Sequence, residues 1–234
     1  MNRQIAVAGA VVVVVGVGAA WWFSQGTEAP TVDVTAPPVE TTSTSPVETT
    51  EPSTGEDSGA PVTYALTSES QAVFTIDEEL RGQPKTVVAT STIVLGELLF
   101  DADDPGSIQL GTVLVNARDF TTDSGNRDRA IRGPILDADI FEFIEFEPTE
   151  IAGLDGAEGE VSFTVTGDLT IRDISNPVTF EVTAVLNADE TISGTAIATV
   201  DRTDWDLDIP SAPGVANVSE LVTLTVSFVA APTA

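Results

Sequence analysis

The sequence contains neither cysteine nor histidine, and these two absences remove most of the common catalytic and metal chemistry. Without cysteine the chain has no disulfide framework, no thiolate zinc site and no cysteine nucleophile. Without histidine it has no Ser-His-Asp triad, no imidazole base and no histidine-ligated metal. We therefore expect no metal and no cofactor. A binding protein, a structural module and an enzyme that works with carboxylates alone stay open.

Basic residues are also scarce, because nine Lys and Arg stand against 37 Asp and Glu, a formal net charge of −28 over 234 residues. Contacts to nucleic-acid phosphates need clustered Lys and Arg, so this balance argues against a nucleic-acid partner. The carboxylates are too numerous to identify a catalytic pair, and we predict no catalytic residue. A carboxylate hydrolase, the open alternative, would need two close acids, one of them with a raised pKa.

Two acidic segments could suggest a more specific role. Residues 101–106 faintly resemble a calcium loop but lack the acidic ligands at its later positions. Asp204, Asp206 and Asp208 fall on one face of an extended segment, which indicates a polar barrel rim. Neither segment therefore predicts a metal site.

The first 23 residues are predicted to form a transmembrane signal-anchor. Residues 5–23 carry no charge and are dominated by Val, Ala and Gly. As a helix this run would be about 29 Å long, close to the roughly 30 Å hydrocarbon core of a bilayer. Arg3 precedes it and the next base is Arg81, so the positive-inside rule places the later residues outside the cytoplasm. The alternative is a cleaved signal peptide, since residues 18–20 are small, and the protein would then be secreted.

Residues 24–60 are predicted to be a disordered linker. Thr, Ser, Pro and Glu dominate this segment, and Leu, Ile, Phe, Trp and Tyr are absent from it. Such a segment cannot bury enough apolar surface to offset its ordering entropy. It would serve either as a tether that lets a domain move over the membrane or as a plain spacer.

Residues 61–234 are predicted to form an all-β domain. Apolar and polar side chains alternate along 161–166, 178–183 and 222–228, which is typical of half-buried strands. Further candidate strands, divided by clusters of turn-forming residues, are 71–80, 85–101, 107–117, 143–152 and 190–202. About eight antiparallel strands at this spacing indicate a sandwich or a barrel. One short helix is expected near 124–132, capped by Asp123 or Ser124 and ended at 133–134.

Four of the eight bases in this domain fall between Arg118 and Arg132. They could meet an anionic lipid head group or a diphosphate through charge-assisted hydrogen bonds. They could equally be structural, with Arg127 paired to Asp128 and Arg132 complementing the helix C-terminus. The sequence leaves both interpretations open.

Two stretches resemble a known family. The first is TTDSGNRDRAIR at 121–132, followed by Phe141 and Phe146, and the second is GDLTIRDISNPVTF at 167–180. They are similar to the threonine-rich turn with its Arg-Asp pair, and to the Gly-x-Leu-Thr-Ile…Pro-Val-Thr signature, of the YceI-like family of lipid-binding domains. The resemblance covers about residues 64–229.

The resemblance implies a lipocalin-like antiparallel barrel around an isoprenoid-type lipid, such as a polyprenyl or quinone tail. It implies a binding protein that sequesters or carries this lipid, and not an enzyme. The anchor predicted at residues 1–23 would tether this protein to the membrane, with the domain outside the cytoplasm. We expect the pocket to be lined by Phe74, Ile76, Leu95, Leu114, Phe141, Phe163, Phe180, Leu224 and Val226. Arg127, Asp128 and Arg132 are expected to serve a head group or the structure. The alternative is a solid barrel or sandwich that acts as an adhesion or stress-related interaction module without ligand.

The two interpretations of the N-terminus differ in the mature protein that they predict. A retained anchor predicts that mass spectrometry of the purified protein finds residues 1–23 still attached. A mature chain that begins near Trp21 would contradict the anchor and support the signal peptide.

Overall fold

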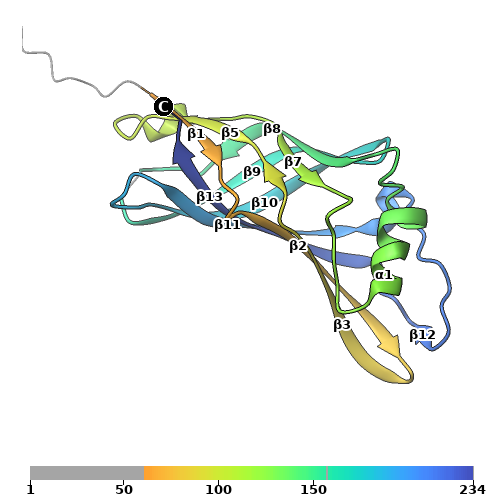
Figure 1. Cartoon of the computed structure of the whole chain (residues 1–234). Helices are drawn as coiled ribbons and strands as arrows, with labels where there is room; N and C mark the ends of the chain where they lie inside the picture. Colours follow the sequence, from red (N-terminus) through yellow and green to blue (C-terminus); the bar gives the residue numbers. More distant parts are fainter. Residues whose placement is uncertain (1–60, 157, 234) are drawn as a thin grey trace, which may run out of the picture. The chain divides into compact units, whose positions relative to one another are not determined.

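The computed structural model describes residues 61–156 and 158–233, which form one curled antiparallel sheet with a short helix at one end (Figure 1). Its strands are β1 (Val62–Leu66), β2 (Gln71–Leu80), β3 (Gln83–Ser91), β4 (Val94–Leu95), β5 (Glu97–Phe100), β6 (Gln109–Leu110), β7 (Val113–Asn116), β8 (Phe143–Ala152), β9 (Glu160–Ile171), β10 (Ile174–Leu186), β11 (Ile192–Asp201), β12 (Val215–Ala216) and β13 (Leu221–Pro232). The helical segments are η1 (Pro105–Ser107), α1 (Gly125–Ala130), the π-helical η2 (Ile131–Ile135) and η3 (Arg202–Trp205).

The predicted anchor and linker, residues 1–60, lie outside the described residues. Within the described part of the chain, none of the helices combines the length and the apolar character that crossing a membrane requires.

Neighbouring strands follow the order β4-β7-β8-β9-β10-β11-β13-β1-β5-β6, and β13 also pairs with β2, which pairs with β3 and β12. Only Thr92 and Ile93 separate β3 from β4, so one continuous segment joins the β2 side of the sheet to β7. A bridge between Thr90 and Thr121 adds a further contact there. The sheet therefore curls and has a concave face (Figure 1).

Strict alternation of apolar and polar residues along the strands makes the concave face apolar and the outer face polar. In β10, Val178, Phe180 and Val182 are buried, whereas the intervening Thr179 and Glu181 are exposed. Successive side chains of a strand point to opposite faces, so this pattern buries one face and solvates the other.

The predicted all-β class is confirmed, but the predicted number of strands was too low. β2 and β8 have the bounds that the sequence predicts, whereas 85–101 contains β3, β4 and β5, and 107–117 contains β6 and β7. Glycines interrupt both runs where neighbouring strands leave little room for a side chain. A Cβ added to Gly96 would lie 3.2 Å from the Leu66 side chain, and one added to Gly111 would lie 3.1 Å from the Glu97 carbonyl oxygen.

The helix extends further than the sequence predicts. It follows Ser124, one of the two predicted caps, although the Ser124 side chain makes no capping hydrogen bond. Pro134 does not end it, because η2 continues to Ile135 in a wider turn, in which the Leu136 amide donates to the Ile131 carbonyl at 2.9 Å. A π-type turn is built from i→i+5 bonds, and Pro134, which has no amide hydrogen, donates none of them.

We predict that Gly194→Ala destabilises the domain by about 2 kcal/mol. A Cβ at this position in β11 would lie 2.6 Å from Phe228 Cζ and closer still to the Thr183 carbonyl oxygen. Gly125→Ala is the matched control, because a Cβ there meets nothing within 4 Å and alanine favours helix. Urea unfolding of both variants measures the difference, and equal midpoints would contradict the prediction.

Candidate functional site

The concave face of the sheet encloses a cavity of about 700 Å³. Apolar side chains from most strands and from η2 form most of its lining, among them Phe74, Ile131, Phe163, Phe180 and Phe228. Cavities of this size and character are typical of sites for small apolar ligands.

Strand periodicity explains why the lining is apolar. In β13, every second residue from Val222 to Phe228 lines the cavity. In β2, every second residue from Ala72 to Leu80 does so, and Glu78 is the one charged member of this row. The sequence thus places a single carboxylate among apolar side chains, at one end of the cavity.

Six of the nine predicted pocket residues line the cavity, and three do not. Those on the lining are Phe74, Ile76, Phe163, Phe180, Leu224 and Val226. Leu95 is 48 % exposed, because the alternation of β4 turns its neighbour Val94 inward instead. Leu114 of β7 misses the lining for the same reason, since its neighbours Val113 and Val115 line the cavity. Phe141 lies before β8 and is half-buried outside the lining. As ligand contacts, the six stay predictions.

Trp205 and Leu207 line the cavity although neither was among the predicted pocket residues. Both are buried, and the Trp205 indole Nε1 donates to the Leu169 carbonyl at 3.0 Å. The flanking Asp204, Asp206 and Asp208 are exposed. The three acids therefore form the outer face of this segment, and the residues between them point inward. The alternation that predicts a polar rim could also have identified Trp205 and Leu207 as lining residues.

The cavity reaches solvent mainly at the end of the sheet where α1 lies, which we call the mouth. Six lining residues exposed to solvent come from the β2–β3 hairpin, the start of α1 and the loop before β12: Arg81, Asp123, Asn126, Pro210, Ala212 and Pro213. Figure 1 shows these segments together at one end. Among the described residues, Glu97 is the exposed lining residue at the opposite end.

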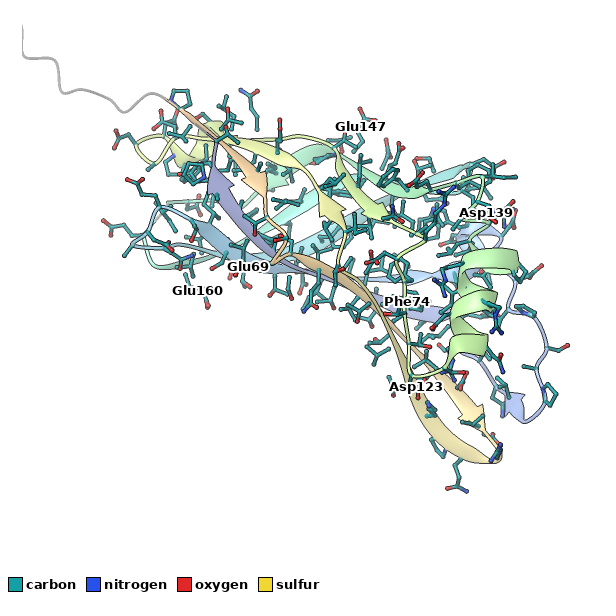
Figure 2. All side chains as sticks on the ribbon, viewed as in Figure 1. Glu69, Phe74, Asp123, Asp139, Glu147 and Glu160 are labelled. Carbon is teal, nitrogen blue, oxygen red and sulfur yellow. The ribbon has the colours of Figure 1, made fainter. Side chains whose placement is uncertain are left out.

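Four charged residues at the mouth form one ion-pair network, which we call the mouth cluster: Glu78, Lys85, Asp123 and Arg127. Asp123 Oδ2 accepts from Lys85 Nζ and Asp123 Oδ1 from Arg127 Nη1, both at 2.5 Å. Arg127 Nη2 donates to the buried Glu78 Oε1 at 2.8 Å. The hydrogen bond from Lys85, and then the charges of Lys85 and Arg127, lower the pKa of Asp123. The cluster therefore ties the β2–β3 hairpin to the start of α1, beside Asp123 in Figure 2.

The predicted pairing of Arg127 with Asp128 is not formed. Arg127 pairs with Asp123 and Glu78, whereas Asp128 Oδ1 accepts from the amide and the hydroxyl of Thr122, each at 2.7 Å. Asp128 is buried within helix α1, and these two bonds hold its carboxylate against the turn that precedes the helix. Arg132 Nε donates to the Asp128 carbonyl at 3.2 Å. Neither Asp128 nor Arg132 belongs to the lining of the cavity.

The shifted pKa values of the described carboxylates do not single out a hydrolase site. Four described carboxyls have a displaced pKa, and in each case hydrogen bonds lower it: Asp119, Asp123, Asp189 and Asp201. A general acid needs a raised pKa instead. Across the described ranges, no group of three or more acids is placed to hold a metal ion.

Comparisons with known proteins place this fold among known ones. The family model described as a YceI-like domain matches residues 64–230. BcnA from Burkholderia cenocepacia has a similar structure, with a TM-score of 0.57 and 18% sequence identity, and the match covers 71% of this chain and 99% of BcnA. A polyisoprenoid binding domain from Saccharophagus degradans, implicated in plant cell wall breakdown, is 10% identical, with a TM-score of 0.56 over 74% of this chain and 99% of that one. No curated protein matches the chain.

We predict that Asp119→Ala destabilises the domain by about 1 kcal/mol at neutral pH. Asp119 Oδ2 accepts from the Thr92 amide at 2.6 Å and the Thr92 hydroxyl at 3.0 Å, and these bonds hold the β3–β4 junction against the segment before α1. The Thr92 amide in particular lowers the pKa of Asp119 in the folded state. Its contribution is therefore present above the unfolded pKa of about 3.9 and is lost as pH falls through the lower folded pKa.

Urea unfolding of wild type and variant across this pH range measures the effect. The difference in unfolding free energy between wild type and variant should shrink as the pH falls. A difference that stays constant to pH 2 would contradict the role assigned to the carboxylate.

Proposed function

We propose, because this chain belongs to the family of YceI-like domains, that it binds an isoprenoid-type lipid in the cavity of its curled sheet. In this proposal the sheet acts as a lipocalin-like barrel that surrounds a polyprenyl or quinone tail. The protein sequesters or carries the lipid and does no chemistry on it.

The observation that carries the proposal is the cavity, about 700 Å³ in volume and lined mostly by apolar side chains. A branched hydrocarbon chain offers nothing to hydrogen-bond, so apolar area must hold it. Burying roughly 400 Å² of ligand surface at about 25 cal/mol per Å² gives about 10 kcal/mol before the costs of association. The similarity to a polyisoprenoid binding domain supports the same class of ligand.

The cellular placement is part of the proposal. The charge-free run at residues 5–23 is long enough to anchor the chain, and the linker at 24–60 would tether the domain outside the cytoplasm. A lipid-binding domain held near a bilayer could exchange its ligand with that bilayer.

The solid interaction module is the competing function, and it requires a filled interior. Neither the cavity nor its apolar lining would be needed for adhesion through the acidic outer surface. A binding role for the interior therefore accounts for more of the structure.

Identification of a co-purifying lipid tests the function directly. The full chain, purified from its native host, should carry an isoprenoid-type lipid that native mass spectrometry detects and solvent extraction releases. Repeated recovery of an empty protein, together with no uptake of added polyprenol, would overturn the proposal.

We predict that Ala196→Trp abolishes this uptake. Ala196 faces the cavity from the middle of β11, between Val182 and Val226, so an indole there fills the space that a lipid chain needs. Thr199→Trp is the matched control, because Thr199 is exposed on the outer face of the same strand. Circular dichroism verifies that both variants fold, and equal polyprenol uptake by both would contradict the prediction.

A further inference from the structure

We infer that the mouth selects isoprenoid lipids with an uncharged head group, such as an alcohol or a quinone, over those that end in a diphosphate. This inference rests on the proposed function and concerns the same site. Its basis is that the cations of the mouth cluster are already neutralised by carboxylates of the chain.

The mouth cluster offers no net positive charge to a ligand. It contains two cations, Lys85 and Arg127, and two anions, Asp123 and Glu78. Both oxygens of Asp123 are engaged, one by each cation. A diphosphate that entered here would meet carboxylates beside every cation of the cluster.

Exchange of partners within the cluster is also disfavoured. Glu78 is only 9 % exposed and lies in the inward row of β2, where the other cavity-facing members are apolar. If a diphosphate recruited Arg127, the Glu78 carboxylate would stay buried without its partner, and an uncompensated buried charge is strongly unfavourable. The buried carboxylate thus holds Arg127 in its present role.

Two further cations line the cavity near the mouth, and neither makes a diphosphate site. Arg81 is exposed at the tip of the β2–β3 hairpin. Arg202 is half-buried, and its Nε and Nη1 donate to the carbonyls of Ser219 and Leu207 at 3.1 and 2.7 Å. A diphosphate needs several converging donors. One guanidinium already fixed by two carbonyls suits instead a single uncharged acceptor, such as a quinone carbonyl or a hydroxyl oxygen.

The charge of the whole domain acts in the same direction. Residues 61–234 contain eight bases against thirty acids. The summed field of such a domain lowers the local concentration of anions and raises that of cations. An uncharged head group does not experience this repulsion.

Paired probes that differ only in the head group test the inference. We would measure binding of geranylgeraniol and of geranylgeranyl diphosphate to the full chain at low salt. The alcohol should bind at least about tenfold more tightly. Raising the salt concentration should strengthen diphosphate binding, because screening weakens the repulsion, and should leave alcohol binding nearly constant.

Charge removal at the mouth provides the matched variant. Asp123→Asn leaves the cluster with a net positive charge and should reduce the preference for the alcohol about tenfold. Glu160→Gln removes the same charge at the opposite end of the sheet, where Figure 2 shows Glu160, and should leave both affinities unchanged.

The outcomes separate this inference from the proposed function. Diphosphate binding as tight as that of the alcohol, or weakened by salt, overturns the selectivity and leaves the lipid-binding function standing. Binding of neither probe overturns both. The salt series on the wild-type chain decides between these outcomes even if the Asp123 variant does not fold.

Discussion

The structure depends on the alternation of inward and outward side chains along the strands of a curled sheet. The inward side chains do not fill the space that the sheet encloses. Each long strand sends every second residue to the concave face, and these residues are apolar in β10 and β13 alike. A curled sheet with an apolar interior can be packed solid or can hold a ligand. Here small residues such as Ala72, Ala184 and Ala196 share the lining with phenylalanines, and a cavity of about 700 Å³ is left between them. The same pattern that stabilises the sheet therefore also lines the cavity.

The mouth adds a second constraint, because one inward position is a carboxylate. Burial of a carboxylate is unfavourable without a partner, and Arg127 on α1 donates to the buried Glu78 at 2.8 Å. This pair links the helix to the β2–β3 hairpin, and Asp123 and Lys85 complete the network. The mouth is consequently fixed by electrostatics, whereas the interior is fixed by apolar packing.

The sequence predicts features that local periodicity determines and misses those that depend on the path of the chain. Local patterns and turn-forming residues predict the bounds of β2 and β8, and six of the predicted pocket residues line the cavity, because burial on one face leaves a direct trace in the sequence. It cannot say which of two faces is concave in a short strand, so Leu95 was expected inside while Val94 is there. Partners across the fold are also invisible, since Arg127 finds Glu78 at a separation of 49 residues and not its neighbour Asp128. Composition alone did not predict a cavity, whereas the resemblance to a family did.

The scarcity of bases acquires a physical meaning once their positions are known. All eight bases of residues 61–234 lie at the mouth end, on the β2–β3 hairpin, the segment 117–132, the β9–β10 turn and η3. The charged residues in the turns at the other end are all acidic. At the mouth the chain leaves its ladders, and carbonyls lose their strand partners. Arginines replace those partners: Arg118 donates to the carbonyls of Ala138 and Asp139, and Arg202 to those of Leu207 and Ser219. Arginines that could suggest an anion site are thus engaged in holding loops together.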